Sequence, residues 1–242
     1  MLKILACVLM LVDHIGAMFF PASGIWRMIG RLAMPIFAYC IAQGLCHTKN
    51  RKMYIKRMAI FSVLSQLPFV YFRHYCGVQD DLNIWRMLNI GFVWLSALII
   101  IHLWEDRKMK DWKRHMLMSI ILVATAFVPM DYGVYAVLLV IVFYYLMVKS
   151  DHPNGALFAN FIVLLGYGGL NYAFAQMWGY EQNNSLSYAF ATVLSQLPAI
   201  FAVPLISWLK EHDSKIKLNK WVFYIFYSAH MLVLVAIKHL WF

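Results

Sequence analysis

The feature that most constrains this chain is a series of nine long apolar runs that nearly fills its 242 positions. A helix that crosses a membrane needs about 20 mostly apolar residues. The runs are continuous rather than alternating, which excludes the strands of a membrane barrel, and the short connections leave no room for a soluble domain. The runs lie near residues 2–20, 27–46, 53–72, 84–104, 115–130, 132–149, 156–178, 186–208 and 221–241.

These runs predict one all-α integral-membrane domain over residues 1–242, a polytopic transmembrane bundle of about nine spans. Eight to ten spans are possible, because the runs 115–130 and 132–149 adjoin through Pro129–Asp131. The composition agrees with this class, since 63% of the residues are hydrophobic and 13% are charged. Soluble domains carry about 45–50% apolar and about 25% charged residues.

The basic residues orient the predicted spans. The chain has 21 Lys and Arg against 11 Asp and Glu, but no basic stretch forms a soluble module, so we expect no nucleic-acid partner. Lys and Arg gather in the cytoplasmic loops of membrane proteins. A cytoplasmic N-terminus places 16 of the 21 on that side, and we therefore expect this orientation. The inner residues are Lys3, Lys49, Arg51, Lys52, Lys56, Arg57, Arg107, Lys108, Lys110, Lys113, Arg114, Lys149, Lys210, Lys215, Lys217 and Lys220.

One acidic residue, Asp13, stands well inside a predicted span and is followed by His14. A disposable leader has no reason to carry charge there, so we expect the first run to be retained. Intramembrane ionisable groups are candidates for function, each with a partner to be named. Arg27 and Arg31, at the outer end of the second run, are the expected partners of Asp13. The alternative is an Asp–Arg bridge that only ties two helices together.

A second histidine, His230, lies on the last run, with Tyr227 one turn before it on the same face. At 1.5 Å per residue, His14 and His230 stand roughly 18 and 13 Å from the inner ends of their helices, near the middle of a ~30 Å core. We therefore expect a buried polar chamber in which histidine transfers protons near neutral pH. Further candidates for its lining are Asn89, Asp131 and Tyr132. The alternatives are that Asn89 bridges helices and that the other two cap the sixth span.

The four cysteines, Cys7, Cys40, Cys46 and Cys76, form no CxxC pair, and two of them lie inside apolar runs. This spacing suggests neither a zinc site nor a disulfide framework. We therefore predict no metal.

Two ordered motifs in the N-terminal third carry a family resemblance. They read Met10-Leu11-Val12-Asp13-His14-Ile15-Gly16 and Gly30-Arg31-Leu32-Ala33-Met34-Pro35-Ile36-Phe37-Ala38. Shorter matches are Leu88-Asn89-Ile90, Asp131-Tyr132-Gly133 and Phe223-Tyr224-Ile225-Phe226-Tyr227 followed by His230. With these motifs the chain resembles the TraX family of bacterial membrane proteins. One departure is Ser228-Ala229, which stand where the family usually shows a proline.

The resemblance implies an activity. The family is named for a protein that acetylates the N-terminal amine of pilin, and it is similar to multi-spanning acyltransferases that use cytoplasmic acyl-CoA. It implies here an acetyl-CoA-dependent N-acetyltransferase of the bacterial inner membrane. The acceptor would be a small molecule or a peptide such as a pilin, modified on an amine or a hydroxyl. The acyl chain length, the choice of direct or ping-pong transfer and the oligomeric state stay open.

The candidate residues take roles within this hypothesis. His14 is the base or an acyl carrier, Asp13 and Arg31 position it, and Arg31 or Arg27 alternatively stabilises the oxyanion. His230, with Tyr227, contacts the thioester or the acceptor. Five cations could bind the CoA phosphates by charge, unless they only orient the chain: Lys49, Arg51, Lys52, Lys56 and Arg57. The competing functions are a transporter or flippase that uses the same chamber as a path, and a non-catalytic assembly scaffold.

Overall fold

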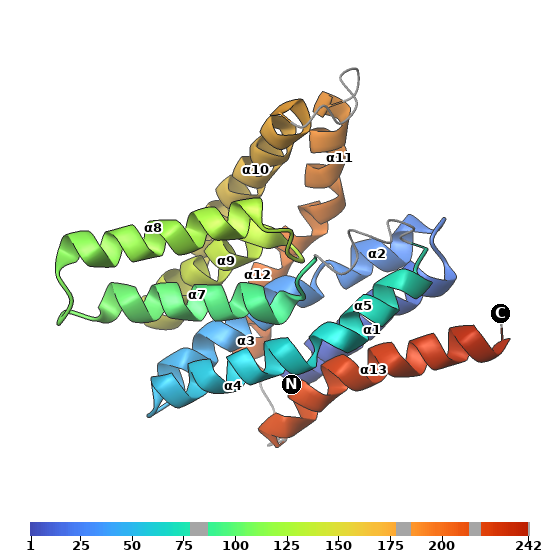
Figure 1. Cartoon of the computed structure of the whole chain (residues 1–242), viewed down its shortest axis with the longest axis horizontal. Coiled ribbons are helices and arrows are strands. Elements are labelled where there is room, and N and C mark those ends of the chain that lie inside the picture. Colours follow the sequence, from blue (N-terminus) through green and yellow to red (C-terminus); the bar gives the residue numbers. More distant parts are fainter. Residues whose placement is uncertain (78–86, 178–184, 213–218, 242) are drawn as a thin grey trace.

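The computed structural model describes residues 1–77, 87–177, 185–212 and 219–241, and every regular element in these ranges is a helix (Figure 1). The expected all-α class is therefore confirmed. The elements are α1 (Leu2–Phe19), α2 (Gly24–Gly30), α3 (Ala33–His47), α4 (Arg51–Leu64), α5 (Gln66–Tyr75), α7 (Ile90–Glu105), α8 (Asp111–Phe127), α9 (Gly133–Val142), the π-helix η1 (Phe143–Lys149), α10 (Pro153–Met177), α11 (Ser185–Gln196), the 3₁₀-helix η2 (Leu197–Phe201), α12 (Ala202–Glu211) and α13 (Lys220–Trp241).

Five helical segments among the described residues are long and apolar enough to cross a membrane. They are Leu2–Phe19, Gly24–His47, Pro153–Ala173, Phe190–Glu211 and Trp221–Leu240. Two shorter apolar segments, Ile90–Glu105 and Gly133–Lys149, coincide with further predicted spans. These helices support the assignment of the chain as a membrane protein. The count of about nine spans and the cytoplasmic N-terminus stay predictions. Residues 84–86 and 178 of the predicted spans, and the counted cations Lys215 and Lys217, lie outside the described residues.

Prolines explain why several predicted spans are broken into two helices. Proline has no N–H, so it cannot donate to the carbonyl four residues earlier, and its ring crowds that carbonyl. Pro35 acts in this way on Arg31, and α2 ends at Gly30 just before it. Pro68 acts on Leu64, the last residue of α4. The first break matters for the site, because it places Arg31 in the junction between α2 and α3.

Helix α3 lies at the centre of the bundle and packs against α1, α7, α9 and α12. Its side chains Ile36, Tyr39 and Leu45 are almost completely buried. Helix α13 covers α1 and α5, and α8 covers α7 and α9 on the other side of the bundle (Figure 1). The outer helices expose large apolar side chains such as Ile120 of α8 and Ile225 of α13, which is the pattern expected of helices that face lipid.

Helices α1 and α2 approach each other closely because glycine stands at both contacts. A Cβ atom at Gly30 would lie 2.2 Å from the Cβ of Asp13, and one at Gly16 would lie 2.2 Å from the Cβ of Trp26. Small residues allow such backbone proximity between membrane helices. The contact brings the arginines at the end of α2 beside Asp13.

Ion pairs join the connections at one end of the bundle. We call it the basic end, and it contains the start of α4 and the ends of α7, η1 and α12. The carboxylate of Glu105 accepts hydrogen bonds from Arg51, at the start of α4, and from Lys149, at the end of η1. Lys210 of α12 donates to Asp151 at 2.7 Å, and this hydrogen bond holds the pKa of the Asp151 carboxyl below its usual range. Cation-bearing connections that are distant in the sequence therefore lie together.

Candidate functional site

Two histidines from opposite ends of the sequence form the centre of the site. His14 on α1 and His230 on α13 are hydrogen-bonded, with Nδ1 of His14 2.7 Å from Nε2 of His230. Their rings are nearly parallel, with planes that differ by 11°. The structure therefore brings together the two histidines that were named from the sequence.

The hydrogen bonds assign the tautomers of both rings. Nδ1 of His230 lies 2.6 Å from the carbonyl oxygen of Phe226, and a carbonyl only accepts, so this nitrogen carries the proton. In a neutral ring Nε2 of His230 is then an acceptor, and Nδ1 of His14 must donate to it. Nε2 of a neutral His14 is left with a free lone pair. In this arrangement His14 is the member of the pair that has an unprotonated nitrogen available to accept a proton.

Asp13 is held by Arg27, one of the two partners proposed from the sequence. Nη1 of Arg27 lies 2.5 Å from Oδ2 of Asp13, and the side chain of Asp13 is buried. The second proposed partner, Arg31, instead donates from Nη1 to the hydroxyl of Tyr132 at 2.9 Å. Oδ1 of Asp13 is buried without a hydrogen-bond partner, so the carboxylate keeps one acceptor atom unused.

A tight turn between α8 and α9 places Asp131 and Tyr132 in the site. Asp131 N–H donates to the carbonyl of Leu88 at 2.9 Å, and Tyr132 adopts the left-handed conformation with φ of 60°. Such a backbone is uncommon outside glycine and recurs at functional sites. Burial raises the pKa of Asp131 to about 6, against the lowering effect of Arg31 and Arg73.

Asn89 has a structural position. Its Oδ1 accepts from Gly91 N–H at 2.8 Å and so caps the start of α7. Its Nδ2 donates to the carbonyl of Ser62 at 2.7 Å and to Oε1 of Gln66 at 2.9 Å. Asn89 therefore bridges three helices, as the alternative interpretation had it, and both its amide nitrogen and its amide oxygen are engaged.

Three cavities meet around these residues. The arginine cavity, of about 330 Å³, contains Asp13, His14, Arg27, Arg31, Phe69, Phe72, Arg73, Cys76, Asp131 and Tyr132 in its wall. The central cavity, of about 40 Å³, shares Asp13, His14, Asp131 and Tyr132 with it and adds Trp94 and Tyr227. The aromatic cavity, of about 140 Å³, shares Trp94 and Tyr227 with the central cavity. The three form a series, with His14 in the wall between the central and arginine cavities.

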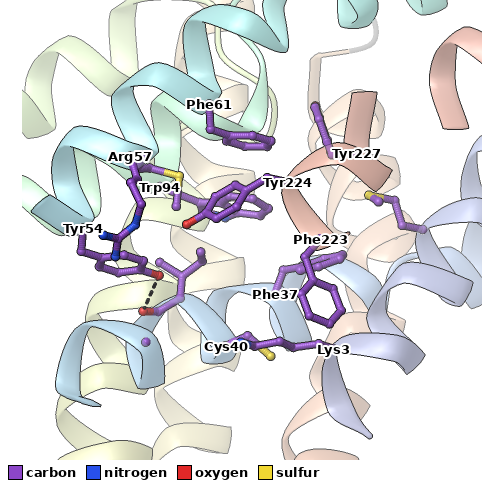
Figure 2. A pocket seen from close by; sticks show the side chains of 14 residues that line it. Lys3, Phe37, Cys40, Tyr54, Arg57, Phe61, Trp94, Phe223, Tyr224 and Tyr227 are labelled. Carbon is purple, nitrogen blue, oxygen red and sulfur yellow. Dashed lines mark hydrogen bonds between the residues drawn. The ribbon is translucent and has the colours of Figure 1, made fainter. Parts of the chain in front are cut away.

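The aromatic cavity is walled by rings and has cations at its edge (Figure 2). Arg57 and Tyr54 of α4 lie on one side, and Lys3 and Phe223 lie on the other. The guanidinium of Arg57 lies 5.6 Å from the ring centre of Tyr54, and the amine of Lys3 lies 5.4 Å from that of Phe223. Nε of Arg57 is buried without a hydrogen-bond partner.

The five cations proposed for phosphate binding separate into three groups. Arg57 lines the aromatic cavity. Arg51 is occupied by Glu105 and also donates to Tyr144 at 3.1 Å. The other three are exposed at the basic end: Lys49, Lys52 and Lys56.

Sequence reasoning missed several residues of the site. Lys3 was counted only for orientation, and Arg73 was one of the five cations not placed on the cytoplasmic side. Trp94 stood in an unbroken apolar run and gave no signal. Tyr224 was noted only as a motif position, and Tyr54 lay in a predicted span without a role. Within the described ranges no group of three His, Cys, Asp or Glu residues could hold a metal ion.

Comparison with known proteins gives two kinds of match. A family model described as "TraX protein" matches residues 1–238. A probable fimbrial assembly protein FimC, serogroup H1, of Dichelobacter nodosus is 26% identical over 249 aligned residues, covering 98% of this chain and 94% of that protein. An uncharacterized Rickettsia prowazekii protein is 49% identical over 39 residues, 16% of each chain. No solved structure matches.

Proposed function

Because this chain belongs to the TraX family, we propose that it is a membrane-embedded acyltransferase that moves an acetyl group from acetyl-CoA to an amine. The observation that carries the proposal is the histidine pair, with Nδ1 of His14 2.7 Å from Nε2 of His230. A base whose second nitrogen is fixed by a partner is the arrangement that general-base catalysis needs.

The chemistry follows from the tautomers. The acceptor amine attacks the thioester carbonyl carbon while Nε2 of His14 takes the amine proton. The imidazolium that forms donates from Nδ1 to Nε2 of His230, which holds its charge in place. The tetrahedral intermediate then expels the CoA thiolate, and the thiolate takes the proton from His14. Arg27, which lines the adjoining cavity, would supply positive charge for the developing oxyanion.

The aromatic cavity fits the acyl end of the donor. Its volume of about 140 Å³ is below the roughly 300–1,000 Å³ of pockets that enclose a whole ligand. The nucleotide of an acyl-CoA would therefore remain at the basic end, where Lys49, Lys52 and Lys56 are exposed. Arg57 and Lys3 would contact the phosphates nearest the cavity by charge.

The fimbrial assembly relative supports a peptide amine as the acceptor. The likeness extends over 98% of this chain. We therefore propose that this protein modifies a pilus subunit or a similar peptide. We place the protein in the bacterial inner membrane as a multi-pass chain of about nine spans, with its N-terminus in the cytoplasm. Acetyl-CoA from the cytoplasm would then reach the aromatic cavity at the basic end.

A transporter or flippase is the second candidate, because three cavities lie in series through the bundle. The central cavity of about 40 Å³ holds little more than one water molecule, which favours group transfer over passage of a solute. Uptake of an amine into liposomes without acetyl-CoA would support transport, and formation of CoA on addition of an amine would exclude it.

The test is acetyl transfer by the purified protein in detergent, measured as release of CoA thiol and as acetylated amine. We expect His14→Ala to lower kcat by about 10²–10⁴, the range for loss of a general base. His212→Ala, a change at an exposed histidine at the end of α12, is the matched control and should keep full activity. Normal turnover by His14→Ala would contradict the assignment.

A further inference from the structure

The arginine cavity holds more positive charge than its carboxylates balance. Arg27, Arg31 and Arg73 line it together with Asp13 and Asp131, and Asp13 is already paired with Arg27 at 2.5 Å. No carboxylate in the described parts of the chain lies within ion-pair distance of Arg31 or Arg73. Unpaired charge is costly away from bulk water, so the cavity favours an anion.

The partners that these two arginines do have are weak ones for a cation. Arg31 donates to the neutral hydroxyl of Tyr132 at 2.9 Å. Arg73 donates to the thioether sulfur of Met87, a weak acceptor. Nε of each is buried without a hydrogen-bond partner. Asp131, the other carboxyl group in the wall of this cavity, has its pKa raised only to about 6 by burial, so it is mostly ionised at pH 7. It forms no ion pair with Arg31 or Arg73, and the cavity still has three guanidiniums against two carboxylates.

The same cavity contains the proposed base. Phe72 of α5 packs against His14 with ring centres 4.5 Å apart, and the next residue along α5 is Arg73. The guanidinium of Arg73 also lies 5.8 Å from the ring centre of Phe69, which limits its movement. A molecule bound to Arg73 would thus lie in the cavity that has His14 in its wall.

Resting on the proposed acyl transfer, we propose that the arginine cavity is the acceptor site and that it selects an acceptor whose amine lies a few bonds from a carboxylate or phosphate, held by Arg73 and Arg31. A guanidinium binds such groups through two parallel hydrogen bonds. The anion would fix the molecule and leave its amine at Nε2 of His14. The anionic group could belong to a free amino acid or short peptide, or to a phosphoethanolamine lipid headgroup.

Two acceptor pairs of equal size test this selection: 4-aminobutyrate against 4-aminobutanamide, and O-phosphoethanolamine against ethanolamine. With wild-type protein we expect kcat/KM at least tenfold higher for the anionic member of one or both pairs, mainly through a lower KM. Arg73→Gln should abolish the preference, and Arg73→Lys should keep part of it. Arg107→Gln, a change at an exposed arginine of the basic end, is the control and should keep it fully. Equal kcat/KM within both pairs, or an equal loss on all four amines in Arg73→Gln, would overturn the proposal.

The pairs also distinguish the source of the anion. A preference confined to phosphoethanolamine, with acetylated lipid recovered from phosphatidylethanolamine vesicles, identifies a headgroup. A preference for 4-aminobutyrate identifies an amino acid or peptide carboxylate.

Failure of the acyl transfer itself is recognised separately. If none of the four amines is acetylated, calorimetric titration of O-phosphoethanolamine without a donor still tests the site. Binding that is lost in Arg73→Gln and kept in Arg107→Gln supports the anion site, and no binding to the wild type overturns it.

Discussion

The arginine cavity and the aromatic cavity lie on either side of the central cavity and differ in chemistry. The first is walled by three guanidiniums, two carboxyl groups and the rings of Phe69 and Phe72. The second is walled mainly by rings and aliphatic groups, with Lys3 and Arg57 as its cations. His14 lines the arginine and central cavities and does not line the aromatic one.

In the proposed transfer, the two cavities would suit two unlike substrates. A thioester arm is largely apolar and suits walls such as Trp94 and Tyr224, whereas a charged acceptor needs fixed counter-charges. The central cavity of about 40 Å³ is the narrow place between them. The proposed transfer would occur there, where the histidine pair closes one side.

The largest expected effect is on kcat, and it concerns the histidine pair that would serve the substrates of both cavities. His230→Leu removes the acceptor for Nδ1 of His14, so we expect kcat to fall by about 10²-fold with little change in KM. His230→Gln keeps a carbonyl that can accept this hydrogen bond, and it should lose markedly less. Steady-state kinetics of the two variants make the comparison. An equal loss in both would show that His230 serves packing rather than the tautomer of His14.

The wall between the aromatic and central cavities sets the next effect. Trp94 lines both, and Trp94→Ala would join them into a larger acyl site. We expect the ratio of butyryl to acetyl transfer to rise about tenfold, since each methylene in an apolar pocket is worth ~1–3 kcal/mol. Competition between the two acyl-CoA donors measures the ratio. An unchanged ratio would argue that the acyl group does not reach this wall.

A smaller effect is expected at the mouth of the aromatic cavity. Arg57→Gln should raise the KM for acetyl-CoA about fivefold and leave kcat unchanged, because it removes one charge-assisted contact of ~1 kcal/mol. Lys108→Gln, at an exposed lysine of the α7–α8 connection, is the matched control. A fall in kcat without a change in KM would place Arg57 in the chemical step instead.

The smallest expected effect is on the pH dependence of stability, and it comes from Asp131 in the wall of the arginine cavity. The folded pKa of Asp131 is raised to about 6, above an unfolded value near 3.9, so the folded state binds the proton more tightly. The stability that this proton contributes is present below about pH 4 and is lost as the pH rises through about 6. Relative to Asp131→Asn, the wild type should therefore melt progressively lower between about pH 4 and 6. Parallel melting curves in detergent across this range would contradict the raised pKa.

Much of the fold could be predicted from the sequence, because long apolar runs have one stable form in a membrane. Backbone groups in lipid must be paired internally, and a continuous run pairs them only as a helix. The runs near 2–20 and 221–241 correspond closely to α1 and α13. The runs 27–46 and 53–72 were predicted as unbroken spans, and the structure divides them into α2–α3 and α4–α5 near Pro35 and Pro68.

The site likewise has residues that the sequence identified and contacts that only the structure shows. Asp13 and His14 were recognisable because ionisable groups inside an apolar run are expensive. Their actual contacts depend on which helices pack together, and this is where the sequence left alternatives open. Arg27 rather than Arg31 holds Asp13, and Asn89 caps α7 and bridges helices.

The sequence by itself therefore determined the helical class, the membrane character and the residues too costly to be accidental. Only the tertiary structure decided that His14 donates to His230, that Arg73 faces an unbalanced cavity and that Lys3 reaches an aromatic one. The physical reason is the distance along the chain over which each effect is set. Helix formation and the cost of burying a charge are set within a single segment, whereas a hydrogen bond between residues 216 positions apart is set by how glycine contacts and proline breaks allow separate helices to pack.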